Sequence, residues 1–378
     1  KGEEQSMSDL EPEDRINSIE QLDVVVDTDG HVAESYEELV KYVENSAVRK
    51  QLERSESPLS DVYTTVHPSP RNRDMYGGGG AYGESFTYSP DNKVRELEDF
   101  DIDYSVLNST RNLNISSVNN DRLASALAHA YNSYILDFLD DRDRFKANIL
   151  TAPKIPDRAA EEIDDRADED AFVGVAMYLG GLSPPAGDRR YEPIVEAAAD
   201  NGLPLVFHSA GAGLNQAFPR AYSGAQTYIE EHAISHPFQH MASLTSLLFN
   251  GVPEKHPSLD FVFLEAGIGY VPYMTWRLDD HYLEAPDQVP GLRRLPSSYI
   301  EDQFYFTTQP LGHTANDPNH IARAIEMAGP GSIMYSADLP HADFDPPREL
   351  FDRINSHFDS ETVRGIMGET AVDIFGLT

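Results

Sequence analysis

The sequence predicts a (β/α)8 barrel with a long insertion after its first strand. Short apolar runs typical of buried strands alternate with amphipathic helical segments through most of the 378 residues, an order that indicates a parallel sheet. Eight such units favour a closed barrel over an open doubly wound sheet. No Gly-x-Gly-x-x-Gly motif follows the first strand, which disfavours a nucleotide-binding fold. The expected strands are 22–27, 104–108, 145–150, 173–179, 203–208, 259–265, 303–307 and 332–336.

The remaining segments complete this architecture. Two stretches interrupt the alternation of strands and helices: segment 35–99, and the Gly- and Ala-rich segment 209–235, which is expected to be a loop at the barrel mouth. Segment 35–99 contains helical pieces over 37–52 and then a Pro/Gly-rich part, and an insertion at this point would lie over the mouth. The expected helices are 121–139, 158–167, 191–200, 241–250, 271–282, 318–327 and 347–357.

The domain boundaries follow from the first strand. Residues 22–378 are expected to form a single domain, and residues 1–21 an N-terminal tail. Met7 is a candidate natural start, with residues 1–6 as a candidate cloning remnant.

The composition is strongly acidic. Asp and Glu number 64 against 29 Lys and Arg, the formal net charge is −35, and lysine occurs only seven times. Such a chain should repel nucleic acids and anionic membranes, because both bind through cationic residues. A folded protein this acidic resembles those of salt-loving cells, where molar salt screens self-repulsion. The chain has no cysteine, no apolar stretch long enough to span a membrane and no visible signal peptide, so a cytoplasmic location is expected.

Ionisable residues stand at the ends of several expected strands. Asp29 and His31 follow the first strand, His208 ends the fifth, Glu265 ends the sixth, and Asp338 follows the eighth. A lone strand-end histidine is usually structural, but these groups should meet at one rim of the barrel, where buried charges need a partner. We expect a divalent cation to be bound by Asp29, His31, His208 and Asp338. Imidazole and carboxylate ligands suit zinc, manganese or iron(II).

These residues carry a resemblance to a known family. Asp29-Gly30-His31, His208 and Asp338-Leu339-Pro340-His341 are similar to motifs of the amidohydrolase superfamily. Segments 235–241, 263–279 and 368–377 are similar to the amidohydrolase-related branch that contains aminocarboxymuconate-semialdehyde decarboxylase. The resemblance runs from about residue 22 to 377 and is weakest across 35–99. It implies a metal-dependent barrel enzyme that acts on a small molecule, commonly as a homodimer.

Three departures from the family pattern bear on the metal. An aspartate, Asp29, stands where the superfamily usually has histidine, and Glu265 replaces the usual strand-six histidine. Binuclear members use a carboxylated lysine at the end of strand four, and residues 173–190 contain no lysine. We therefore expect one divalent ion, zinc first, with manganese or iron as alternatives.

The resemblance also implies roles for individual residues. Asp338 is expected both to bind the metal and to shuttle the proton of its bound water. Glu265 is either a second acid/base or substrate-binding group, or a carboxylate that holds His208. His236 stands beside Pro237 at an expected helix start, and we expect it to contact the substrate or transfer a proton; the alternative is a structural role as a helix cap.

Two reactions and one binding role remain open. Hydrolysis of an amide, ester or lactone by a metal-activated water is the main expectation, because a negative Glu265 disfavours an anionic substrate. The alternative is non-oxidative decarboxylation of a small unsaturated or aromatic carboxylate, which Arg71 or Arg73 in the insertion would hold. The third possibility is that the barrel binds a ligand without catalysing a reaction.

Overall fold

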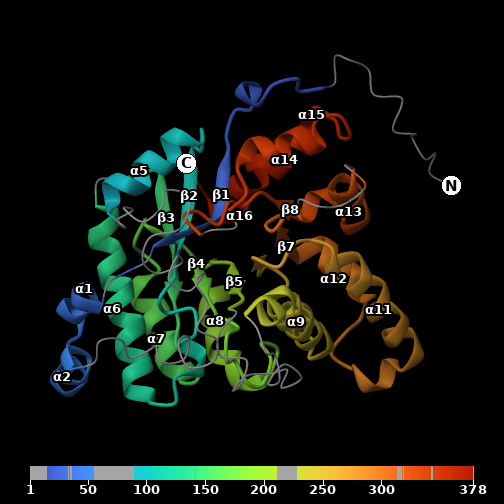
Figure 1. The fold of residues 1–378 in the computed structure, drawn as a ribbon. Coiled ribbons are helices and arrows are strands. Elements are labelled where there is room, and N and C mark those ends of the chain that lie inside the picture. The colour runs from blue at the N-terminus through green and yellow to red at the C-terminus, as the bar shows by residue number, and fades with distance from the viewer. Residues whose placement is uncertain are drawn as a thin grey trace.

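A parallel sheet of eight strands forms the centre of the molecule in this computed structural model (Figure 1). The strands follow chain order around the sheet, and each pairs with the next. Their bounds are β1 Val26–Val32, β2 Tyr104–Ser109, β3 Phe145–Leu150, β4 Phe172–Ala176, β5 Leu205–His208, β6 Phe261–Leu264, β7 Phe304–Thr307 and β8 Ile333–Met334. The structure describes residues 15–54, 89–210, 228–312, 317–341 and 344–377, except 33, 35, 141 and 318.

Backbone hydrogen bonds bring the last strand against the first. The amide of Thr28 donates to the carbonyl of Tyr335 at 3.4 Å, and the amide of His31 donates to the carbonyl of Leu339 at 2.8 Å. The Thr28 hydroxyl also donates to the Tyr335 carbonyl, at 2.7 Å. The sheet therefore closes on itself, and the predicted (β/α)8 barrel is confirmed.

The helices surround this barrel, with α6 and α7 on one side and α11 to α13 on the other (Figure 1). Within the described residues the α-helices are α1 Tyr36–Tyr42, α2 Ser46–Arg54, α5 Pro90–Asp99, α6 Asp121–Leu139, α7 Pro156–Arg166, α8 Glu192–Asp200, α9 Tyr228–Phe249, α10 Val252–Lys255, α11 Tyr270–Glu284, α12 Pro296–Gln303, α13 His320–Ala328, α14 Pro347–Ile354, α15 Ser360–Arg364 and α16 Thr370–Phe375. A π-helical turn, Gly365–Glu369, joins α15 to α16. Among the described helices, none has the length and apolarity that a membrane crossing needs.

Two apolar layers hold the fold together. The larger lies between the strands and the surrounding helices. The smaller fills the barrel interior with side chains such as Val26, Val106 and Val206, and Phe375 of α16 packs against it. Both layers follow from the period-two alternation of the strands, which sends successive side chains to opposite faces. The interior is therefore a packed plug, and polar side chains can collect above it.

The element bounds differ from the sequence prediction at two places that matter for the site. Strand β1 runs on to Val32 instead of ending at Asp27, with a register shift against β2 between Asp27 and Gly30, so Asp29 and His31 lie within the strand. The prediction ended the strand with its apolar run, but the polar residues continue to pair with β2.

Helix α9 begins at Tyr228, so His236 lies inside it and not at its start. The prediction was wrong because proline usually marks the first turn of a helix, whereas Pro237 is well inside α9. The predicted loop 209–235 therefore ends earlier, and its residues 211–227 lie outside the described part of the chain. In the insertion, α1, α2 and α5 are described and residues 55–88 are not.

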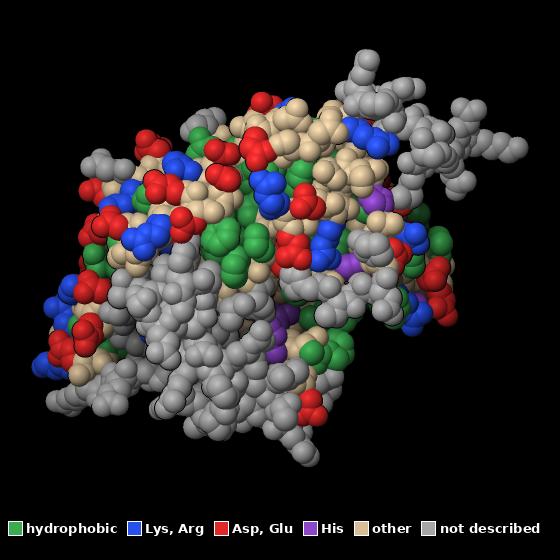
Figure 2. All heavy atoms as spheres, turned by 45° about the horizontal axis from the view of Figure 1, so that its top comes forward, with side chains coloured by type: hydrophobic (Ala, Val, Ile, Leu, Met, Phe, Trp, Pro, Cys, Tyr) green, Lys and Arg blue, Asp and Glu red, His purple; other side chains and the backbone are tan. Residues whose placement is uncertain are grey.

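The acidic surface leads to a testable expectation about salt. Acidic side chains are dispersed over the face in Figure 2 and do not gather in one patch. With a net charge of −35, self-repulsion opposes the compact state at low ionic strength, and salt screens it. We expect the midpoint of thermal unfolding to rise steadily from dilute buffer to molar potassium chloride. A midpoint that stays constant over this range would contradict the expected adaptation to high salt.

Candidate metal centre

The period-two alternation of the strands places polar side chains directly above the apolar plug. On β2, Asn108 stands two residues beyond Val106, and on β5, His208 stands two residues beyond Val206. Residues two apart on a strand share a face, so both polar side chains point into the barrel at its carboxyl end. Asp29 and His31 of β1 share a face by the same rule. This end of the barrel is where enzymes of this fold place their active sites.

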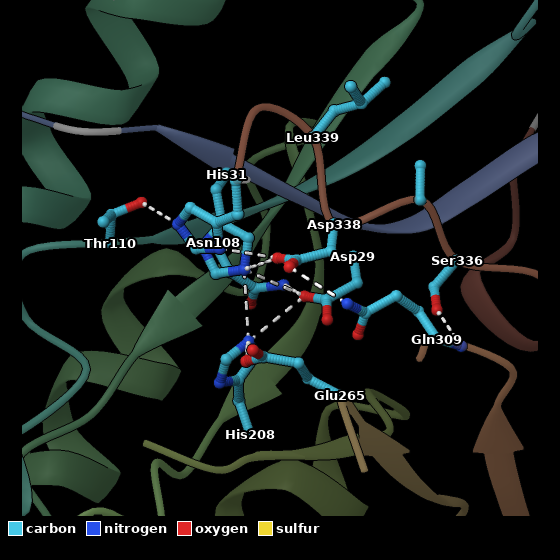
Figure 3. A network of polar contacts seen from close by, with 12 residues as sticks. Asp29, His31, Asn108, Thr110, His208, Glu265, Gln309, Ser336, Asp338 and Leu339 are labelled. Carbon is cyan, nitrogen blue, oxygen red and sulfur yellow. Dashed lines mark hydrogen bonds and ion pairs between the residues drawn. The ribbon is translucent and has the colours of Figure 1, made fainter. Parts of the chain in front are cut away.

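Five ionisable side chains converge at this position (Figure 3). The Nε2 atoms of His31 and His208 lie 3.1 Å apart. Asp29 Oδ1 is 3.4 Å from each of them, Asp338 Oδ1 is 3.3 Å from His31 Nε2, and Glu265 Oε2 is 3.1 Å from His208 Nε2. Asp29, His31, His208 and Asp338 are fully buried, so these groups are shielded from bulk solvent.

The distances fit ligands around one divalent ion. Donor atoms about 2.0–2.2 Å from a zinc ion lie roughly 3.3–3.6 Å apart in a tetrahedron, and octahedral ligands lie about 3.0 Å apart. The orphaned Oδ2 of Asp29 and Nδ1 of His31 have no hydrogen-bond partner, so hydrogen bonds alone do not satisfy this cluster. Asp29, His31 and His208 thus offer a donor set that fits a metal ion, and Asp338 lies beside it.

The two histidines of the cluster differ in their electrostatics, and those of His31 favour a ligand role. Burial, reinforced by the neighbouring His341, lowers the pKa of His31 to about 3, so its imidazole is neutral at ordinary pH. Burial would lower the pKa of His208 as well, but Asp29 and Glu265 outweigh it and raise that pKa. His208 Nδ1 lies 2.5 Å from the carbonyl of Ser209. Because a carbonyl only accepts, Nδ1 carries a proton and Nε2 faces the cluster.

The carboxylate of Asp29 is held in its ionised form. Burial alone would raise its pKa, but the imidazoles of His208 and His31 outweigh burial and lower it. Asn108 supports the same state, because its side-chain amide donates to Asp29 Oδ1 at 2.9 Å. In this arrangement a bound cation would replace the proton that His208 otherwise shares with the carboxylates.

Two residues of the cluster adopt a backbone conformation that normally favours glycine. Glu265, directly after β6, has a φ of 59°, and Asp338, four residues after β8, has a φ of 61°. A left-handed conformation costs a residue with a Cβ roughly 1–2 kcal/mol. Strain of this kind clusters at active sites, where a side chain is needed at that point. Both residues aim their carboxylates at the cluster, so the strain coincides with the site.

A family model described as amidohydrolase matches residues 26–377. The chain belongs to the amidohydrolase family. This confirms the resemblance that the motifs of its strand ends carry. No functionally curated protein matches this amidohydrolase in sequence.

Solved structures resemble this amidohydrolase over nearly its whole length. 5-Carboxyvanillate decarboxylase from Sphingomonas paucimobilis is 22% identical, with a TM-score of 0.67 over 94% of this chain and 99% of the other. A dihydroxybenzoic acid decarboxylase from Polaromonas sp. JS666, with bound manganese and the inhibitor 2-nitroresorcinol, is 18% identical, with a TM-score of 0.68 over 94% and 97%. An amidohydrolase from Mycobacterium avium subsp. paratuberculosis K-10 is 18% identical, with a TM-score of 0.71 over 94% and 98%.

The structure brings together most of the residues that the sequence singled out. Asp29, His31, His208 and Asp338, the four expected ligands, lie in one buried cluster. Glu265 joins it, and His236 Nε2 lies 3.5 Å from Glu265 Oε1. Burial, with neighbouring histidines, lowers the pKa of His236 well below its usual value. The predicted substrate-binding residues Arg71 and Arg73 lie outside the described residues, and their role stays a prediction.

Sequence reasoning missed the amides that orient the carboxylates. Asn108 at the end of β2 contacts Asp29, and Gln309 after β7 donates from Nε2 to Asp338 Oδ2 at 3.2 Å. Asn148 of β3 in turn donates to Asn108 Oδ1 at 3.0 Å. Asn108 and Gln309 lie at the ends of their strands like the predicted ligands, so extending the strand-end rule from charged residues to amides would have found both.

A buried carboxyl beside the cluster gives a pH-dependent prediction. Glu34 is fully buried and accepts hydrogen bonds from Ser109 and Asn112, and burial raises its pKa to about 7. An unfolded glutamate has a pKa of about 4.3, so between these values the folded state binds more protons. The free energy of unfolding therefore falls as pH rises from about 4.5 to 7, by a few kcal/mol in all.

Replacing Glu34 with glutamine should remove this contribution. We expect the metal-free E34Q variant to match the wild type near pH 4.5 and to be the more stable of the two at pH 8, as measured by urea unfolding at each pH. The exposed Glu53→Gln serves as control and should leave the pH dependence as it is. An E34Q variant whose stability difference from the wild type is constant with pH would refute the buried-acid account.

Proposed function

We propose that this amidohydrolase catalyses the metal-dependent, non-oxidative decarboxylation of a small aromatic or unsaturated carboxylate. The observation that carries the proposal is the likeness, over 94% of the chain, to two decarboxylases of aromatic acids, one of them with bound manganese. This reaction was the alternative in the sequence analysis, and the comparisons favour it over hydrolysis. Asp29, His31, His208 and Asp338 would hold the ion. Zinc and manganese both suit these ligands.

The reaction needs three things at this rim of the barrel. A divalent ion, when bound, would act as a Lewis acid that neutralises the carboxylate or an adjacent hydroxyl of the substrate. A proton must reach the ring carbon that carries the carboxyl group. The bond between that carbon and the carboxyl group then breaks, CO2 leaves, and the electron pair of the broken bond restores the ring, so no oxidant is required.

Asp338 is the residue we assign to the proton transfer. Its Oδ1 lies 2.7 Å from His341 Nδ1, and His341 Nε2 lies 3.4 Å from the Thr110 hydroxyl. These contacts form a short path along which a proton can reach the carboxyl group of Asp338. Gln309 fixes the other oxygen of Asp338, so the acid is held in one orientation. His236 and Glu265 flank the cluster on the side of β5 and β6 and would contact the substrate or move a second proton.

Hydrolysis is the second candidate, and Glu265 favours it. Its carboxylate lies 3.1 Å from His208 Nε2. As an anion it would repel a substrate carboxylate, but it could accept a proton from a metal-activated water. Decarboxylation instead requires Glu265 to be protonated or a cation to hold the substrate carboxylate, and Arg71 and Arg73 remain our candidates for holding it. The substrate would in either case be a small molecule, and the expected homodimer stays a prediction.

Turnover in heavy water separates the two reactions. The metal-free protein is reconstituted with manganese or zinc and offered hydroxylated aromatic carboxylates beside esters, lactones and amides. We expect CO2 release in equal amount to a product that carries one deuterium at the carbon that lost its carboxyl group. Hydrolysis of an ester, lactone or amide without CO2 release from any carboxylate would overturn the proposal. Absence of turnover on both sets, with the ion bound, would favour the ligand-binding alternative.

A further inference from the structure

A second group of possible metal ligands lies beside the first, on helix α9. His232, His236 and His240 are spaced four residues apart, so they share one face of the helix. His240 is fully buried, with Nδ1 3.2 Å from the Tyr270 hydroxyl, and His236 is nearly so. His232 is partly exposed. The face therefore runs from the interior, beside the cluster, towards the surface.

Two of these histidines form a donor set with Glu265. One ligand atom each from His232, His236 and Glu265 lies within 4.8 Å of the other two, and the rings of His232 and His236 are 4.7 Å apart. Two histidines at positions i and i+4 of a helix, with a carboxylate from another element, are the ligands of open zinc sites. His232 lies outside the motifs that carry the resemblance to the family, and no role for it is predicted from the sequence.

The distance between His236 and Glu265 suits a shared ion better than a hydrogen bond. His236 Nε2 lies 3.5 Å from Glu265 Oε1, whereas N–H···O bonds are usually about 2.7–3.2 Å long. The same 3.5 Å lies within the spacing of roughly 3.3–3.6 Å between tetrahedral zinc ligands. The Nδ1 of His236 lies 3.0 Å from the Ser235 hydroxyl and 3.4 Å from the His232 carbonyl. The other ring nitrogen, Nε2, is therefore the one that faces Glu265.

We propose that His232, His236 and Glu265 bind an auxiliary divalent transition-metal ion, more weakly than the catalytic centre binds its own. Glu265 lies between the two positions, with Oε1 facing His236 and Oε2 facing His208 of the catalytic centre. The catalytic centre keeps its single ion, and the auxiliary ion binds only at higher metal concentration. It would then withdraw His236 and Glu265 from the substrate, so excess zinc inhibits the enzyme. The predicted inhibition by zinc rests on the proposed function, whereas the predicted binding of the auxiliary ion does not.

Zinc binding to the variants tests the auxiliary site directly. The metal-free protein is dialysed against rising zinc concentrations, with excess magnesium present to occupy carboxylate sites on the acidic surface, and bound zinc is counted by mass spectrometry. We expect two ions per wild-type chain. His232→Asn should raise the dissociation constant of the weaker ion at least about tenfold and leave the tighter ion in place. His281→Asn, also a helical and partly exposed histidine, is the matched control and should bind two.

Two outcomes would overturn the proposal. One is a wild type that saturates at a single zinc ion. The other is a second ion whose affinity is the same in His232→Asn and His236→Asn as in the wild type. With cobalt in place of zinc, the second equivalent should give the visible absorption of a site with nitrogen ligands, and His232→Asn should lose that absorption.

Activity provides a separate readout. We expect excess zinc to inhibit the wild type and His281→Asn, and His232→Asn to keep its basal rate and resist this inhibition. If no carboxylate is decarboxylated, the proposed function fails while the count of bound zinc still decides the auxiliary site. If turnover is found and only one zinc binds, the auxiliary site fails and the proposed function stands.

Discussion

Replacing His208 with alanine is expected to lower kcat/KM by at least about 1,000-fold while the barrel stays folded. His208 lies at the centre of the cluster, with Nε2 within 3.4 Å of His31, Asp29 and Glu265. Its loss would remove one of the proposed ligands and leave carboxylates facing each other without the imidazole between them. Asp338→Asn should have an effect of similar size, because it removes both a ligand charge and the assigned proton donor.

Metal content and circular dichroism distinguish this result from unfolding. His208→Ala should lose its tightly bound ion and keep the far-ultraviolet spectrum of the wild type. Asp338→Asn keeps the shape of the side chain and its contact with Gln309, so we expect it to retain a weaker ion and still lose turnover. The exposed Trp276→Ala, on α11, is the control and should keep both the bound ion and the turnover of the wild type. Turnover at the wild-type rate in either site variant would contradict the assigned roles.

Lys93→Met is expected to lower the free energy of unfolding by roughly 3–5 kcal/mol. Lys93 and Glu96 of α5 are both about 1% exposed and form an ion pair. Lys93 Nζ also donates to the carbonyl of Leu339 at 3.3 Å, directly after Asp338. Removing the ammonium group leaves a buried carboxylate without its counter-charge, and it releases the turn that carries Asp338. The end of the insertion thus supports the site through this contact.

Urea unfolding measures this loss, with an unchanged dependence on denaturant as the sign of two-state behaviour. Replacing both members, Lys93→Met with Glu96→Leu, should recover much of the stability, since a buried pair can be exchanged for apolar groups at little cost. Arg158→Met is the matched control, because Arg158 and Glu161 form an exposed pair with the same spacing on α7. It should cost less than about 1 kcal/mol. A Lys93→Met variant as stable as this control would refute a supporting role for the pair.

Much of the site could be predicted from the sequence because the carboxyl ends of parallel strands meet at one rim. That rule alone predicts that Asp29, His208, Glu265 and Asp338 lie close together. It missed Asn108 and Gln309 because it was applied only to charged residues, although a buried amide also needs hydrogen-bond partners. Their contribution depends on which carboxylate oxygen each one meets, and that is set by the register between strands.

Other features depended on tertiary packing that no local pattern encodes. Pro237 predicted a helix start, but α9 continues through it, so His236 was placed at the start of a helix and His232 in the predicted loop before it. Lys93 and Glu96 follow the spacing of an ordinary surface pair, and charged residues are rarely buried. Only the packing of α5 against the turn after β8 encloses them. The reaction likewise cannot be predicted from the proposed metal ligands, because hydrolysis and decarboxylation can use the same ion.

The most direct test of the metal centre is an anomalous difference map from crystals grown with manganese. Our account predicts a strong peak bonded to Asp29, His31, His208 and Asp338, with donor atoms about 2.0–2.3 Å from the ion. A map with no peak among these four residues, while manganese is bound elsewhere on the chain, would contradict it.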